Sequence, residues 1–200
     1  MSNRTDDVKT MADEALKSDK ALAKLTETLS VGTRRERQVA ASAIHAVARE
    51  DASKLTESID VLIDALNRPE GQTRWECLEA LTILVDQDAR SCSKAIQEAE
   101  TALFDEESGM VRLAAMRFLC KIGATTANRS EKVWPLIDEG IQCYHGDLEF
   151  NDMLIAIVDF SNGKLADSVK AELAERMAFD STNGKGTLKK RATQIIENLQ

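Results

Sequence analysis

A motif of one basic residue followed by four apolar residues recurs along this chain every 37 to 39 residues. In its clearest copy, which starts at Arg112, the apolar residues follow three, six, seven and ten positions later: Ala115, Phe118, Leu119 and Ile122. The five copies start at Arg37, Arg74, Arg112, Phe150 and Lys189, so four of the five begin with a basic residue. At about 100° per residue, the four apolar offsets lie on one face of an α-helix. The motif therefore predicts a repeating architecture in which each copy is a helix with one buried stripe.

A second apolar stripe lies between successive copies and follows the same period. Its members are Leu22, Leu25, Leu29; Ile59, Leu62, Leu66; Ile96, Ala99, Leu103; Trp134, Ile137, Ile141; and, one residue out of step, Val169, Leu173, Met177. Each repeat is therefore predicted to be a hairpin of two antiparallel helices. Runs rich in turn-forming residues separate the hairpins at 30–33, 67–73, 105–109, 144–147 and 181–186. Thr33 with Glu36, and Thr73 with Glu76, have the spacing of capping boxes that open helices.

The hairpins are expected to stack, because a single hairpin cannot bury its apolar stripe alone. This predicts one all-α domain over residues 1–200. Its hairpins cover approximately 5–30, 33–68, 71–105, 109–145 and 148–181, and a capping helix covers 187–199. The capping helix is expected to expose a basic side that includes Lys185, Lys189, Lys190 and Arg191.

The segments "DEESGMVRLAAMRFLCKIG" and "NRPEGQTRWECLEALTIL" resemble HEAT repeats, especially the short phycobiliprotein-lyase type, and the likeness is strongest over 33–147. The resemblance implies a right-handed, armadillo-like α-solenoid whose second helices line the concave face and bind proteins. It also implies that Arg37, Arg74 and Arg112 are structural and pair with acidic turn residues such as Glu70, Asp105 or Glu107. The hairpin 148–181 departs from the family pattern, since Phe150 stands in the arginine position, and its turn is expected to differ.

The composition limits the class of protein. Aromatic residues make up 4% of the chain and there are two prolines, which favours helices over a β-sandwich or a barrel. No apolar run approaches the roughly 20 residues that span a bilayer, and the N-terminus lacks the apolar core of a secretory signal, so a cytoplasmic location is expected. Four cysteines form no C-x-x-C pair and lie in apolar helical patterns, so they are expected to be buried thiols. The net charge of −8 disfavours nucleic acid and favours basic partners.

A row of surface residues recurs at equivalent positions of the second helices: Glu27, Asp64, Thr101, Glu139 and Glu175. One interpretation is a negative track that binds a basic segment of a partner protein through charge-assisted hydrogen bonds. The other is that an acidic protein places carboxylates on every solvated face. Trp75 follows the arginine position outside the core stripe and is a candidate anchor for a partner. Trp134 shares a core column with Ile59 and Ile96 and is expected to pack there.

No motif for an enzyme or a cofactor is present: there is no G-x-S-x-G elbow, glycine-rich phosphate loop or H-E-x-x-H. Cys143, His145 and Asp147 could supply part of a metal site, but His145 is expected to be a solvated turn residue. The sequence thus predicts a protein-binding scaffold or adaptor with no cofactor, and its oligomeric state stays open. The alternative is a HEAT-like enzyme or accessory subunit that acts on nucleic acid, like a DNA glycosylase, or on a tetrapyrrole-bearing protein.

Overall fold

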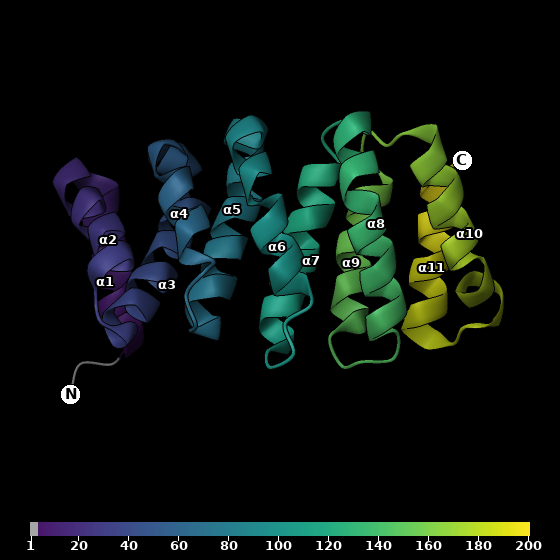
Figure 1. The fold of residues 1–200 in the computed structure, drawn as a ribbon, viewed down its shortest axis with the longest axis horizontal. Helices are drawn as coiled ribbons and strands as arrows, with labels where there is room; N and C mark the ends of the chain where they lie inside the picture. Colours follow the sequence, from purple (N-terminus) through teal and green to yellow (C-terminus); the bar gives the residue numbers. More distant parts are fainter. Residues whose placement is uncertain (1–3) are drawn as a thin grey trace. The chain divides into compact units, whose positions relative to one another are not determined.

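The computed structural model describes residues 4–200, and every regular element in that range is an α-helix or a 3₁₀ helix. The chain divides into two compact units, Met1–Ala102 and Leu103–Gln200. Within each unit, successive helices form antiparallel hairpins (Figure 1). The prediction of a single domain over 1–200 stays a prediction, whereas the all-helical repeat is observed in both units.

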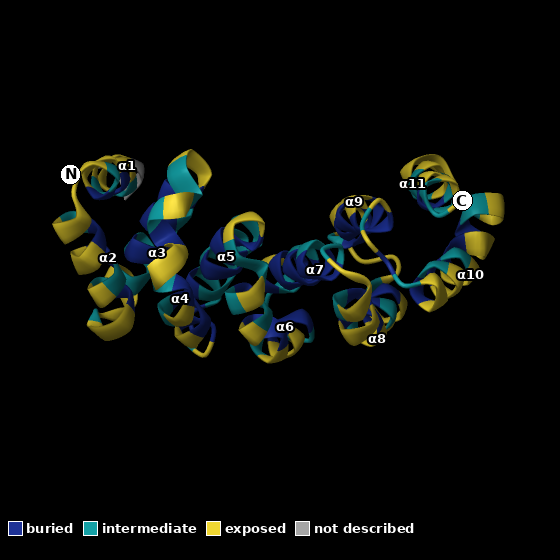
Figure 2. Cartoon of the chain, turned by 90° about the horizontal axis from the view of Figure 1, so that it is seen from above, coloured by how far each residue is buried: buried dark blue, intermediate teal, exposed yellow. Residues whose placement is uncertain are grey.

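The first unit consists of three hairpins. Its elements are α1 (Arg4–Lys17), α2 (Asp19–Val31), α3 (Arg34–Asp51), η1 (Ala52–Ser58), α4 (Ile59–Ala65), α5 (Gly71–Cys92), η2 (Ser93–Ala95) and α6 (Ile96–Leu103), which reaches the boundary. The first helices α1, α3 and α5 pack against one another as one layer, and α2 and α4 belong to a second layer (Figure 2).

The second unit repeats this arrangement with α7 (Gly109–Gly123), α8 (Ala127–Tyr144), α9 (Phe150–Ser161), α10 (Asp167–Asn183) and α11 (Gly186–Asn198). Here α7, α9 and α11 form the first layer, and α8 and α10 form the second. The last helix covers α9 and α10 and buries Ala192 and Ile195 against them. It thus occupies the place predicted for the capping helix at 187–199.

The apolar stripes of the repeat form the core of both units. All the apolar positions of the motif are buried except Ile196, in the last turn of α11, and Leu199, its C-cap. Both lie at the C-terminal end of this helix. Trp134 is also buried, as its place in the core column predicts.

One of the two predicted capping boxes is correct. Thr33 is the N-cap of α3: its hydroxyl accepts from the backbone N–H of Glu36, whose carboxylate accepts from the N–H of Thr33. The prediction for Thr73 is wrong, because Glu70 is the N-cap of α5 and Thr73 is fully buried in the first turn. Glu70 takes this position because its carboxylate binds Arg37 of the preceding hairpin.

The break between the two helices of a hairpin has its own cap, which the sequence analysis missed. Asp51 and Asp88 both adopt a non-helical backbone, with φ of −151° and −147°. The Oδ1 of Asp51 accepts from the N–H of Ser53, and that of Asp88 accepts from the N–H of Ser91. Thr126 does the same for α8 in the second unit, where its hydroxyl accepts from Arg129 N–H. These short polar side chains satisfy the open N–H groups of the following helix, so no glycine or proline is needed.

The hairpin formed by α9 and α10 has the different turn that Phe150 indicated. In α3 and α7 the arginine lies four residues after the N-cap, whereas Phe150 is the first residue of α9. A loop through Gly146, whose φ is 95°, replaces the missing first turn. Phe150 is buried, and its ring centroid lies 5.0 Å from that of His145. An aromatic contact therefore takes the place of the arginine.

Within each unit, the first helices pack more closely on one another than the second helices do. The expectation that the second helices line the concave face of the solenoid stays a prediction.

Three of the four cysteines, Cys77, Cys92 and Cys120, are buried and free, as predicted. Burial raises the pKa of the Cys77 and Cys120 thiols well above the ordinary value. The prediction for Cys143 is wrong, because its side of α8 faces solvent. Among residues 4–200, no helix combines the length and apolarity that crossing a bilayer requires.

Candidate protein-binding groove

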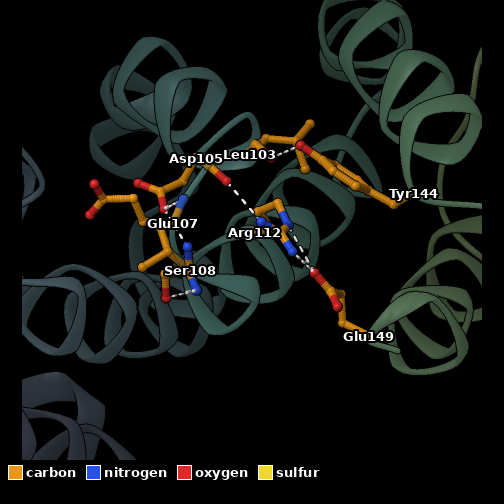
Figure 3. A network of polar contacts seen from close by, with 8 residues as sticks. Leu103, Asp105, Glu107, Ser108, Arg112, Tyr144 and Glu149 are labelled. Carbon is orange, nitrogen blue, oxygen red and sulfur yellow. Dashed lines mark hydrogen bonds and ion pairs between the residues drawn. The ribbon is translucent and has the colours of Figure 1, made fainter. Parts of the chain in front are cut away.

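The arginine of the motif joins successive hairpins, as Figure 3 shows for Arg112. Its Nη1 donates to the carbonyl of Asp105 at 2.9 Å, and its Nε donates to Oε1 of Glu149, the N-cap of α9, at 2.8 Å. The guanidinium also lies 5.1 Å from the centroid of the Tyr144 ring, whose hydroxyl donates to the carbonyl of Leu103. One side chain thus links the start of α7, the end of α8 and the start of α9.

Arg37 makes the same two kinds of contact in the first unit. Its Nη1 donates to the carbonyl of Gly32 at 2.8 Å, and its Nη2 forms an ion pair with Glu70, the N-cap of α5. In both units the arginine therefore binds the glutamate that precedes the next first helix. The partner Glu149 was not foreseen, and the pairing of Arg74 with Asp105 or Glu107 stays a prediction. Arg37 and Arg112 are engaged in contacts within the fold, so they do not form a surface for a partner.

All five residues of the predicted acidic row, Glu27, Asp64, Thr101, Glu139 and Glu175, are exposed. In the first unit, Glu27 lies on α2 and Asp64 on α4, with Thr101 on α6. In the second unit, Glu139 and Glu175 lie on α8 and α10, which pack side by side. A row that continues through both units stays a prediction.

A groove opens between α8 and α10 in the second-helix layer of the second unit. It encloses about 460 Å³ and is lined by Trp134, Asp138, Glu172, Glu175, Arg176 and Phe179. Of the predicted row, only Glu175 lines it. The volume falls in the range of pockets that take small ligands or single side chains.

Two polar contacts tie α8 to α10 across this groove. The indole Nε1 of the buried Trp134 donates to Oε2 of Glu172 at 2.5 Å. Arg176 binds Asp138 with two parallel hydrogen bonds, Nε to Oδ1 at 2.6 Å and Nη2 to Oδ2 at 3.0 Å. Hydrogen bonding to Asp138 raises the pKa of the Arg176 guanidinium above its ordinary value. Arg176 and Asp138 therefore neutralise each other.

The groove keeps an excess of negative charge beside an aromatic ring. The partner of Glu172 is the neutral indole of Trp134, and Glu175 is exposed to solvent. Phe179 leaves 72% of its surface in water, which is unusual for a phenyl ring on a helix. Glu172, Glu175 and Phe179 are spaced at i, i+3 and i+7, so they share one face of α10. This spacing is visible in the sequence, but a comparison of equivalent positions between repeats identifies only Glu175 and misses Glu172 and Phe179.

Trp75, the predicted anchor, belongs to a different surface. It is half-buried on α5, in the first-helix layer, next to a polar cluster between α3 and α5. In that cluster Glu76 accepts from the Ser42 hydroxyl at 2.8 Å and contacts His45 Nδ1 at 2.7 Å. Gln72 donates in turn to the Ser42 oxygen. The structure thus separates Trp75 from the second-helix layer on which the acidic row lies.

Glu76 should make the stability of the protein depend on pH. Burial raises the pKa of Glu76, but hydrogen bonds from His45, Ser42 and Trp75 outweigh it, so the pKa lies below the ordinary value of 4.5. A carboxyl whose pKa is lower in the folded state adds stability above its unfolded pKa, and this is lost as the pH falls through the folded pKa. We expect Glu76→Gln to lose less stability than the wild type between pH 7 and pH 3.5 in urea unfolding. The exposed Glu50→Gln serves as control, and equal losses in all three proteins would contradict the expectation.

No protein-family model matches this chain, and no curated protein matches its sequence. Solved structures match its fold. A designed armadillo repeat protein in complex with the peptide (KR)4 aligns with a TM-score of 0.76 and 15% identity over 96% of this chain and 91% of that one. A structure of computationally designed armadillo repeat proteins for modular peptide recognition aligns with a TM-score of 0.73 and 15% identity over 96% and 92%. An engineered protein aligns with a TM-score of 0.75 and 16% identity over 98% and 90%.

The fold of this chain is that of an armadillo-like repeat solenoid. The predicted fold class, an all-α solenoid of antiparallel hairpins, is thereby confirmed, whereas the closer likeness to the phycobiliprotein-lyase type stays a prediction. Within residues 4–200 the solenoid has no group of three or more His, Cys, Asp or Glu side chains arranged to hold a metal ion. The groove between α8 and α10 is concave, acidic and partly aromatic.

Proposed function

We propose that this protein is a binding scaffold that takes a basic segment of a partner protein along the second-helix layer of its second unit. The observation that carries the proposal is the groove between α8 and α10, where Glu172 and Glu175 lie beside the exposed Phe179. Carboxylates pair with Lys or Arg through charge-assisted hydrogen bonds, and an exposed ring next to them covers the aliphatic part of the same side chains.

The mechanism is rigid display. The two helices are joined by the Trp134–Glu172 and Arg176–Asp138 contacts, so the groove is formed before a partner arrives. Less conformational entropy is then lost on binding. The net charge of −8 attracts basic segments over a distance of about 10 Å at 0.1 M salt, so the association rate should fall as salt is added.

The structural neighbours support this type of function. The structure of one designed armadillo repeat protein contains the peptide (KR)4. Other armadillo repeat proteins were designed for modular peptide recognition. These peptide-binding properties belong to the other proteins. For this chain they support the proposal that a stack of similar hairpins can hold an extended basic peptide.

The test is binding of a fluorescein-labelled (KR)4 peptide, followed by fluorescence anisotropy at 50 mM salt. We expect the double variant Glu172→Gln/Glu175→Gln to bind on the order of tenfold more weakly, because it removes two charge-assisted contacts. Glutamine keeps an oxygen that can accept from Trp134, so the groove should stay intact. The matched control is Glu197→Gln, an exposed carboxylate on α11 in the other layer, which should bind like the wild type. Equal binding by all three proteins would refute the proposal.

A second variant separates the groove from the longer acidic row. Asp64→Asn/Glu139→Gln neutralises two exposed members of the row outside the groove and leaves Glu172 and Glu175 in place. If the partner binds mainly in the groove, this variant should lose less than threefold in affinity. A loss equal to that of the groove variant would instead favour a track along the whole row.

The alternative function, an enzyme or accessory subunit that acts on nucleic acid, predicts the opposite charge preference. Duplex DNA should then bind at 150 mM salt through basic residues such as Lys189, Lys190 and Arg191 on α11. Our proposal expects no shift with duplex DNA at that salt, and it includes no catalytic step and no cofactor. The same anisotropy assay with a labelled DNA duplex decides between them.

A further inference from the structure

We propose that the groove between α8 and α10 is selective for arginine over lysine, with the partner's guanidinium stacked on Phe179 and bound by Glu172 and Glu175. This inference rests on the function proposed above and names the chemistry of the residue that enters the groove. It assigns the exposed ring a role that a purely electrostatic surface would not need.

The charges of the lining residues call for a cation. Asp138 and Arg176 bind each other through two parallel hydrogen bonds. A ligand that bound either side chain would have to break this pair. Glu172 binds the neutral indole of Trp134, and Glu175, one turn later on the same helix, is exposed and lies in the field of the neighbouring Arg176. Side chains at i and i+3 have Cβ atoms about 5 to 6 Å apart, a spacing that one planar group with several donors can bridge.

The exposed ring favours guanidinium over ammonium. Phe179 follows Glu175 by four residues on α10, and 72% of its surface is exposed. Guanidinium is planar, weakly hydrated and carries five N–H donors, so it can stack on a phenyl face while its edge binds carboxylates. An ammonium group is compact and strongly hydrated, and would give up more water to lie on the same face.

The groove already holds an arginine of its own. The guanidinium of Arg176 bridges from α10 to Asp138 on α8 with two parallel hydrogen bonds, which shows that the spacing of the two helices accommodates a planar donor group. The indole of Trp134 holds Glu172 by its Oε2, so that carboxylate is oriented before any ligand arrives. The site therefore offers a preformed acceptor, a second carboxylate and a flat apolar surface.

The experiment compares labelled octapeptides of the same length, made of arginine only, lysine only or citrulline only, by fluorescence anisotropy with the full chain. We expect the arginine peptide to bind about three- to tenfold more tightly than the lysine peptide, and the uncharged citrulline peptide not to bind measurably. Phe179→Ala should reduce this preference to less than twofold, and Phe179→Tyr should retain it. Leu148→Ala removes another exposed apolar side chain, 99% exposed in the α8–α9 loop, and should change nothing.

The outcomes separate this inference from the proposed function. If arginine and lysine peptides bind equally and Glu172→Gln/Glu175→Gln weakens both, the scaffold function stands and the arginine site is refuted. If Phe179→Ala keeps the preference, the ring has no part in it and the site is likewise refuted. If neither peptide binds the wild type, the proposed function fails and this inference with it. Because Phe179 is largely exposed, its variants should keep the helical circular dichroism of the wild type.

Discussion

Arg37→Met is expected to destabilise the first unit by about 3 to 5 kcal/mol, the cost of leaving a buried charge without its partner. Glu70 is only 2% exposed, and Arg37 provides its ion pair. The loss also frees the carbonyl of Gly32, to which Arg37 donates. Urea unfolding followed by the fluorescence of Trp75, in a Trp134→Phe background, measures the stability of this unit.

The double variant Arg37→Met/Glu70→Leu tests the reason for the loss. Replacing both members of a buried pair by apolar residues is often neutral, so this protein should recover most of the stability that Arg37→Met loses. Arg35→Met removes an exposed charge from the same turn of α3 and should change stability by less than about 0.5 kcal/mol. A cost for Arg37→Met no greater than that of Arg35→Met would show that the pair does not hold the hairpins together.

Phe118→Ala is expected to destabilise the second unit by about 3 to 5 kcal/mol, the usual cost of a buried phenylalanine. Phe118 is 0% exposed and is among the largest fully buried side chains. The repeat alone gives the opposite expectation, because alanine occupies the equivalent position in three other copies: Ala43, Ala80 and Ala156. The physical reason for a large cost is that the neighbours of Phe118 are placed around a ring and cannot fully collapse into its space.

Urea unfolding of this variant in a Trp75→Phe background, with Trp134 as reporter, measures that cost. Phe179→Ala removes an exposed ring from the same unit and should cost less than about 0.5 kcal/mol. If Phe118→Ala is tolerated as well as Phe179→Ala, the core follows the repeat template and not the local packing. A cavity at the site of the missing ring in a structure of the Phe118→Ala variant would agree with the expected loss of stability.

The helices could be predicted from the sequence because their signal is local. A stripe at i, i+3, i+4 and i+7 is decided within one helix, and the period of 37 to 39 residues then gives the hairpin. The five copies of the motif fall on α3, α5, α7, α9 and α11. The prediction was wrong where contacts with a neighbouring helix determine the structure. Glu70, and not Thr73, is the N-cap of α5, because Arg37 binds the Glu70 carboxylate. Cys143 is exposed because its side of α8 faces solvent.

The groove could be predicted only in part. Glu175 was identified because it belongs to the row of equivalent positions on the second helices. Asp138, Glu172 and Phe179 also line the groove but do not belong to that row. The contacts that matter, Trp134 with Glu172 and Asp138 with Arg176, each join residues 38 apart in the sequence. Which side chains meet at that distance depends on the register between α8 and α10, and no local pattern reports it.

The sequence by itself determined that this chain is a series of two-helix repeats with an apolar stripe on each helix, because burial of a helical stripe depends on periodicity alone. The tertiary structure decided which layer is more closely spaced, which glutamate each arginine binds, and that α8 and α10 form an acidic groove beside an exposed ring. These features depend on the distances and register between helices, which arise only when neighbouring side chains pack together.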